Sequence, residues 1–202
     1  MGVNWPDGGK SREQALTTNG NLSLLLDPES DVMDVDLDCQ EAKVLTKLIL
    51  PKPFAQFDRG TSDSRHYLYQ ATSFGPTQRF SGNGCKSTLV ELRGDGSQIM
   101  IPPSIHPDGS RLNFTDINHD APEVEYSDLL KSVSFLAACS EIAQLWVSGR
   151  RHELALSFSG LCLKQNVNPK LLKNIIQRIC QTTGDRDEQD RMNCVRTSVG
   201  KP

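Results

Sequence analysis

The 202-residue sequence lacks several features, and each absence excludes a class of protein. No apolar run approaches the roughly 18 residues of a membrane span, so we expect neither a membrane segment nor a membrane partner. The first residues, MGVNWPDGGKSREQ, lack the apolar stretch of a secretory signal, which predicts a cytoplasmic location. The six cysteines include no C-x-x-C pair, which argues against a thiolate zinc site or a disulfide framework and favours buried free thiols. The chain also has no Walker A pattern and therefore contains no ATP-driven motor.

Positive charge is not in excess either. The net charge is −3, whereas a dedicated nucleic-acid binder is usually basic over its contact face. Any contact with DNA must therefore be local, or supplied by parts outside this chain. Hydrophobic residues make up 37% and charged residues 23% of the sequence, which is ordinary for a globular protein and predicts one domain with a small appendage.

The first part of the chain reads as strands and a helix. Residues 21–38 predict two strands joined by a turn, and residues 40–51 have apolar positions at helical spacing up to a terminating proline. Residues 65–74 are rich in aromatic and β-branched types, which favours another strand. Residues 87–104 predict two short strands around the turn Gly94-Asp95-Gly96, continuing the sheet in antiparallel fashion.

The composition then changes. Residues 116–125 are polar and acidic and contain Pro122, so we place a domain boundary there. Three helices are predicted beyond it: residues 126–146, 150–165 and 168–184. The last has Asn168 as N-cap and Pro169 in its first turn.

Three aspartates alternate with apolar residues at the end of the second predicted strand. Asp34, Asp36 and Asp38 would project from one face of that strand, where their mutual repulsion requires a cation. An exposed, solvated edge strand is the alternative reading. The apolar lead-in LSLLL and the helix that follows favour an internal strand, and thus a divalent metal site. Such oxygen ligands select Mg²⁺ or Mn²⁺, the ions of phosphoryl and nucleotidyl transfer.

Further motifs follow this acidic strand in a specific order. Ser64-Arg65-His66 opens the next strand, Glu91 lies on a strand before a glycine-rich turn, and Pro102-Pro103-Ser104 follows. Together these motifs resemble the primase-polymerase domains of the archaeo-eukaryotic primase superfamily, in the form that phages, prophages and plasmids fuse to a replicative helicase. The resemblance covers roughly residues 20–115, and residues 149–198 resemble the helical segment that leads to the helicase.

The resemblance implies a fold and a domain organisation. The fold is α+β, with an RRM-like primase-polymerase core containing an antiparallel or mixed sheet, followed by a small all-helical C-terminal segment. Residues 1–122 would form the catalytic domain. Residues 123–202 would form the helical segment, which links to a helicase absent from this chain.

The resemblance also implies a catalytic metal site. Asp36, with either Asp34 or Asp38, and with Glu91 as the third carboxylate, would hold two Mg²⁺ or Mn²⁺ ions. Asp36 belongs to both possible pairs, and the sequence leaves the choice between them open. Glu91 stands where the family has aspartate, which keeps the charge on a longer side chain.

A nucleotide-binding set accompanies these ligands. By resemblance, His66 contacts the phosphates of the incoming nucleoside triphosphate and Ser64 supports it, while Arg65 or Arg93 adds positive charge. A histidine held by hydrogen bonds beside a sheet, and an arginine solvated beside a turn, are the structural alternatives for His66 and Arg93.

Two functions follow from these expectations. The first is template-dependent DNA primase and polymerase activity on single-stranded DNA, in the replication of a mobile element. The second is a catalytically weak or inactive DNA-binding module of a primase-helicase, which Glu91 and the acidic net charge favour. A nuclease ranks behind both, because the Ser-x-His motif suits a triphosphate better than a hydrolytic water.

The remaining histidines do not suggest a site by their spacing. His106, His119 and His152 lie far apart, so we assign no metal to them. His152 also belongs to the basic cluster Arg150-Arg151-His152, which opens a predicted helix. This cluster could meet nucleic acid, although a solvated helix terminus is the commoner explanation.

Overall fold

A computed structural model describes residues 17, 20–60, 65–82 and 88–199. These residues form two compact units that interleave along the sequence. The first unit takes the described residues of 1–36, 53–78 and 92–126, and the second takes those of 37–52, 79–91 and 127–202. No helix in these described ranges is long and apolar enough to cross a membrane.

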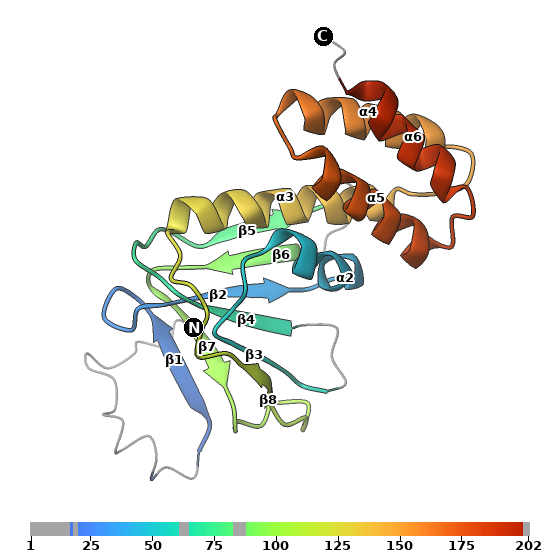
Figure 1. The fold of residues 1–202 in the computed structure, drawn as a ribbon. Coiled ribbons are helices and arrows are strands. Elements are labelled where there is room, and N and C mark those ends of the chain that lie inside the picture. Colours follow the sequence, from blue (N-terminus) through green and yellow to red (C-terminus); the bar gives the residue numbers. More distant parts are fainter. Residues whose placement is uncertain (1–16, 18–19, 61–64, 83–87, 200–202) are drawn as a thin grey trace. The chain divides into compact units, whose positions relative to one another are not determined.

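The strands form two sheets (Figure 1). The larger sheet has six strands in the order β5-β6-β2-β4-β3-β8, and the smaller one pairs β1 with β7. The strands are β1 Leu22–Leu26, β2 Val32–Leu37, β3 Ala55–Asp58, β4 Arg65–Gln70, β5 Gln78–Ser81, β6 Thr88–Arg93, β7 Ser97–Ile101 and β8 Asn113–Ile117.

Strand β2 lies inside the larger sheet, between β6 and β4. Its apolar residues Met33, Val35 and Leu37 are fully buried. Asp34 and Asp36 alternate with them and are also buried. The prediction of an internal acidic strand, rather than a solvated edge strand, is therefore confirmed.

Within the first unit, the smaller sheet packs against β3 and β4 of the larger one through apolar side chains. Strand β1 pairs antiparallel with β7 from Leu22↔Ile101 to Leu26↔Ser97. Buried residues from both sheets form one cluster with Leu112, which precedes β8: Leu26, Ala55, Phe57, Leu68, Ile99 and Leu112. This cluster underlies β3 and β4, which carry part of the candidate site.

The turn between β6 and β7 was predicted, but the sheet to which β7 belongs was not. Strand β7 belongs to the smaller sheet instead of continuing the larger one. Gly94 lies so close to the Gly75 carbonyl that a Cβ added there would be 2.1 Å from its oxygen, and the Asp95 N–H donates to that oxygen. The Gly96 N–H donates to the Leu26 carbonyl, so this turn directs the chain onto β1.

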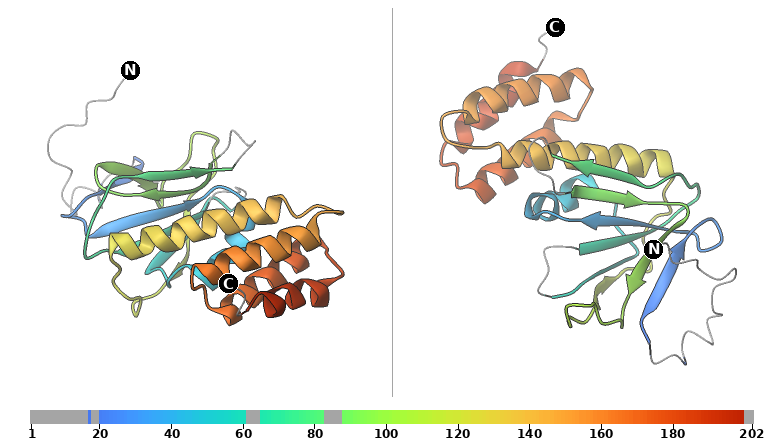
Figure 2. Two further views of the ribbon diagram at one scale, coloured as in Figure 1. Left: turned by 90° about the horizontal axis from the view of Figure 1, so that it is seen from above. Right: turned by 180° about the vertical axis from the view of Figure 1, so that it is seen from behind.

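The second unit contains the helices, of which α4, α5 and α6 lie side by side (Figure 2). The helices are α2 Gln40–Ile49, α3 Tyr126–Gln144, α4 Arg151–Lys164, α5 Pro169–Thr183 and α6 Glu188–Ser198. Helix α4 packs against α6, while α5 packs against both α6 and α2. The α+β class with a helical C-terminal segment is thus confirmed, whereas the division at residues 122 and 123 stays a prediction.

Local signals set the helix ends as expected. Helix α2 ends at Ile49, and Leu50 is extended because it precedes Pro51. Helix α5 begins at Pro169 after Asn168, whose side chain accepts a hydrogen bond from the Lys170 N–H at 2.8 Å. It ends at Gly184, which adopts the left-handed conformation with φ 65°.

Candidate active site

The candidate site starts from two neighbouring strands, β2 and β4. Asp34 on β2 has no exposed surface, and His66 on β4 donates a hydrogen bond from Nδ1 to Asp34 Oδ2 at 2.8 Å. Among the described residues, the other oxygen of Asp34, Oδ1, has no hydrogen-bond partner. A buried carboxylate oxygen without a partner is costly, so this atom marks a place where a further group would bind.

Burial and pairing shift the pKa values of both residues. Burial raises the pKa of Asp34, and the opposing effect of His66 is smaller. Burial acts to lower the pKa of His66, but the charge and hydrogen bond of Asp34, together with the charge of Asp36, outweigh it, so the pKa of His66 is raised. His66 therefore keeps its positive charge to higher pH than an ordinary histidine, and its Nε2–H can donate to an anion.

The ring of His66 is held in place by a neighbouring strand. Phe57 on β3 is directly opposite His66 in the antiparallel pairing of β3 and β4. The two rings stack with centroids 4.6 Å apart and an interplanar angle of 14°. Phe114 on β8 contacts Phe57 edge-on, with the two ring centroids 5.9 Å apart. Phe57 was not predicted as a site residue, because its only signal in the sequence is the short apolar alternation of Ala55 and Phe57.

Asp36 lies two residues after Asp34 on β2 and faces two cationic groups. Its Oδ1 is 3.8 Å from His66 Nε2, and its Oδ2 accepts a hydrogen bond from Arg93 at 2.8 Å. Arg93 is partly exposed, with 28% of its side-chain surface accessible. Asp38 differs, because it follows the end of β2 and is exposed, with its N–H donating to the Leu89 carbonyl.

Glu91 belongs to the second unit. It lies on β6 and is buried, and its carboxylate accepts a hydrogen bond from Arg79 on β5 at 2.8 Å. Arg79 is largely exposed, and the sequence analysis gave no signal for it. The meeting of Glu91 with Asp36 and His66 in one cleft stays a prediction.

The other predicted nucleotide-binding residues have different surroundings. Arg65 pairs with Asp58 across β4 and β3 at 3.0 Å, so its guanidinium also stabilises the sheet. Ser64 lies outside the described residues. The structure thus brings together Asp34, Asp36, His66 and Arg93, of the residues that the motifs identified.

Fold and site together define a class of protein. This is an α+β domain whose internal strand carries two buried aspartates beside a histidine and an arginine, an arrangement suited to binding cations and phosphates. Residues 10–125, more than half of the chain, match the Prim-Pol family, described as the N-terminal domain of bifunctional DNA primase/polymerase. The chain belongs to this family, whose members are nucleotidyltransferases of the DNA primase and polymerase type, and the expected resemblance is confirmed. A search of curated proteins gave no match.

Proposed function

We propose that this protein is a template-dependent DNA primase and polymerase that uses two divalent metal ions. The single observation that carries the proposal is the grouping of Asp34, Asp36 and His66 on β2 and β4, inside a domain of this family. The substrates would be nucleoside triphosphates and a single-stranded DNA template with its primer. We further propose that it acts in the cytoplasm in replication of a mobile element, with a helicase domain or subunit as partner.

The metal ligands in this proposal are Asp34, Asp36 and Glu91. Asp34 and Asp36 are both buried, and Oδ1 of Asp34 has no hydrogen-bond partner among the described residues. Their carboxylates supply hard oxygen donors, which fit Mg²⁺ or Mn²⁺. When bound, such ions activate a primer 3′-hydroxyl and stabilise the departing pyrophosphate. We assign Asp34, not Asp38, as the partner of Asp36, because Asp34 is buried beside His66 whereas Asp38 is exposed beyond the end of β2.

The protein's own cations would hold the nucleotide. His66, charged through its pairing with Asp34, would donate from Nε2 to a phosphate oxygen of the incoming triphosphate. Arg93 would add a second positive charge at the same place, because its guanidinium already lies against Asp36. Phe57 would keep the imidazole ring in the plane that this contact requires.

A second function has support from a specific observation. Glu91 stands at the third acidic position and is tied to Arg79, which competes with a metal ion for its carboxylate. With the net charge of −3, this favours a catalytically weak or inactive DNA-binding module as the alternative.

Primer extension tests the proposal. The full chain should extend a labelled primer on a single-stranded template in Mg²⁺ or Mn²⁺. Asp36→Ala should lower incorporation by at least about a hundredfold, because it removes a ligand present in either pairing. Asp38→Ala is the matched control, and it should retain most of the activity if Asp34 is the partner of Asp36.

The outcomes separate the two functions. Extension that survives Asp36→Ala would show that the site assignment is wrong or that the activity is a contaminant. Loss of activity in Asp38→Ala, with Asp34→Ala still active, would overturn the pairing. A silent wild type that binds single-stranded DNA in a salt-sensitive manner would establish the binding module instead.

A further inference from the structure

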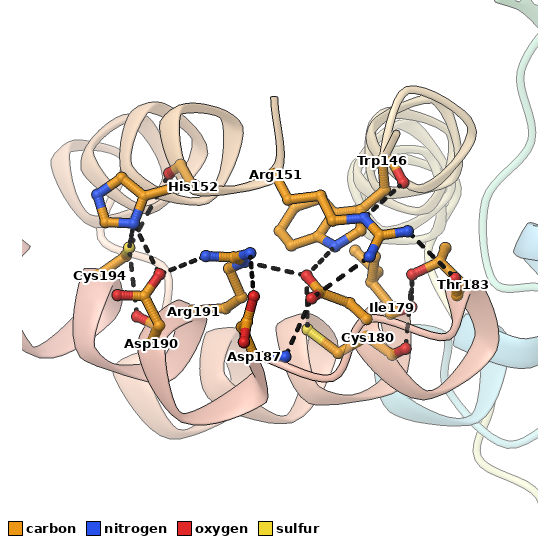
Figure 3. Close-up of polar contacts among 11 residues, drawn as sticks. Trp146, Arg151, His152, Ile179, Cys180, Thr183, Asp187, Asp190, Arg191 and Cys194 are labelled. Carbon is orange, nitrogen blue, oxygen red and sulfur yellow. Dashed lines mark hydrogen bonds and ion pairs between the residues drawn. The ribbon is translucent and has the colours of Figure 1, made fainter. Parts of the chain in front are cut away.

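We propose that His152, Asp190 and Cys194 form a Zn²⁺ site that joins helices α4 and α6. His152 Nδ1 lies 2.7 Å from Asp190 Oδ2 and 3.9 Å from Cys194 Sγ. One possible ligand atom from each of the three residues lies within 4.8 Å of the others. Figure 3 shows the three side chains converging from the two helices.

The helices fix this geometry. Asp190 and Cys194 are four residues apart on α6, so they lie on one face of that helix, and this face packs against α4. His152 is the second residue of α4 and points at that face. The sequence gave no zinc-like spacing because His152 and Asp190 are 38 residues apart, and only the packing of the helices brings them together.

Asp190 already forms an ion pair with Arg191, which also pairs with other carboxylates. Its guanidinium pairs with Asp190, with Asp185 at 3.0 Å and with Asp187 at 3.4 Å. If Asp190 binds a metal ion instead, Arg191 would therefore still pair with Asp185 and Asp187. The contact of Asp190 with His152 Nδ1 would also be replaced, because a metal requires the lone pair of that nitrogen.

The donor set selects the metal. An imidazole nitrogen, a thiolate sulfur and one carboxylate are all ligands of Zn²⁺, whereas Mg²⁺ prefers oxygen alone. Binding would release the proton of the Cys194 thiol to solvent. The three residues would fill three tetrahedral positions, and a water molecule would take the fourth, since the side chain of His152 is 57% exposed to solvent. This site lies wholly within the second unit and does not depend on the proposed polymerase function.

Cobalt titration of the full chain tests the site, with Co²⁺ as a spectroscopic substitute for Zn²⁺. The wild type should bind Co²⁺ at this site with a thiolate-to-cobalt charge-transfer band in the near ultraviolet that saturates at one equivalent of thiolate-bound Co²⁺, and Zn²⁺ should displace it. Cys194→Ser should abolish the band, and His152→Ala should weaken Co²⁺ binding at least about tenfold, as loss of ligand support does.

Two control variants make the result specific. Cys39→Ser also removes one thiol, but serine can still cap α2 through the Ala42 N–H, so this variant should keep the band. Asp36→Ala should keep it too, which separates the site from the proposed catalytic metals.

The proposal is overturned if the wild type shows no charge-transfer band, or if the band survives in Cys194→Ser. Unfolding of Cys194→Ser, detected by circular dichroism, would leave His152→Ala to decide. His152 is exposed in the first turn of α4, so the fold should tolerate its substitution. Unchanged Co²⁺ affinity in His152→Ala would also overturn the site.

Discussion

Asp34 has no exposed surface, yet it carries a carboxyl group with one oxygen bonded to His66 and the other without a partner in the described chain. A single residue thus combines an observed role with a proposed one. It fixes the orientation of His66, and we propose that its other oxygen binds a metal ion. The pairing with His66 depends on two strands that are neighbours in the sheet, and no local pattern in β2 reveals it.

The charge of His66 depends on Asp34, and this dependence is measurable. NMR titration of the wild type should give His66 a pKa above the ordinary value of about 6.5, because Asp34 and Asp36 together outweigh the effect of burial. In Asp34→Asn the charge of Asp34 is lost while burial and the charge of Asp36 remain, so the pKa of His66 should be lower than in the wild type. Comparison with His66→Gln assigns the resonance, and an unchanged pKa in Asp34→Asn would contradict the pairing.

Stability should follow the same linkage. A histidine whose folded pKa is raised stabilises the fold fully below its unfolded pKa of about 6.5, and this contribution is lost as pH rises through the folded pKa. In Asp34→Asn the pKa of His66 is lower, so this contribution is smaller. The stability of the wild type relative to Asp34→Asn, measured by denaturant unfolding, should therefore decrease from pH 6 to pH 9.

At the scale of elements, the turn between β6 and β7 decides how the chain passes from one sheet to the other. The sequence predicted both strands and the Gly94–Gly96 turn, because Gly and Asp mark turns and β-branched residues mark strands. It did not predict that β7 pairs with β1, since that choice rests on the close contact of Gly94 with Gly75.

Gly94→Ala tests this contact. The added methyl group would meet the Gly75 carbonyl oxygen, a backbone atom that cannot move aside alone, so the free energy of unfolding should fall by about 1–3 kcal/mol. Gly160→Ala on α4 is the matched control. Nothing lies within 4 Å of its added methyl group, and alanine favours the helix by about 0.8–1 kcal/mol. Equal changes in the free energy of unfolding for the two variants, measured in urea, would contradict the role of the contact between Gly94 and Gly75.

Some elements gave no readable signal. Strand β8 is exposed along its whole length, so it lacks the alternation of buried and exposed positions that reveals a strand. Strand β5 has only four residues, and α6 carries few apolar residues on its buried face. Helices α3, α4 and α5 were predicted, because their apolar residues recur at spacings of three and four over many turns.

For the whole molecule, motif order carried more information than composition. The net charge and the scattered cysteines suggested no site, whereas the acidic strand, the Ser-x-His motif and the third carboxylate predicted the family that the match over residues 10–125 shows. The sequence did not reveal which side chains of separate elements contact each other in the folded protein. Phe57 against His66, Arg79 against Glu91, and His152 against Cys194 each join elements that are separate in the chain.

The most direct test of the central claim is a crystal structure of the full chain soaked with Mn²⁺ and a non-hydrolysable nucleoside triphosphate. The account predicts an anomalous Mn²⁺ peak about 2.1 Å from carboxylate oxygens of Asp36 and Glu91. It also predicts a phosphate oxygen within hydrogen-bonding distance of His66 Nε2. An ordered nucleotide and Mn²⁺ bound away from Asp36 and His66, or a Glu91 carboxylate on the opposite face of the sheet, would contradict it.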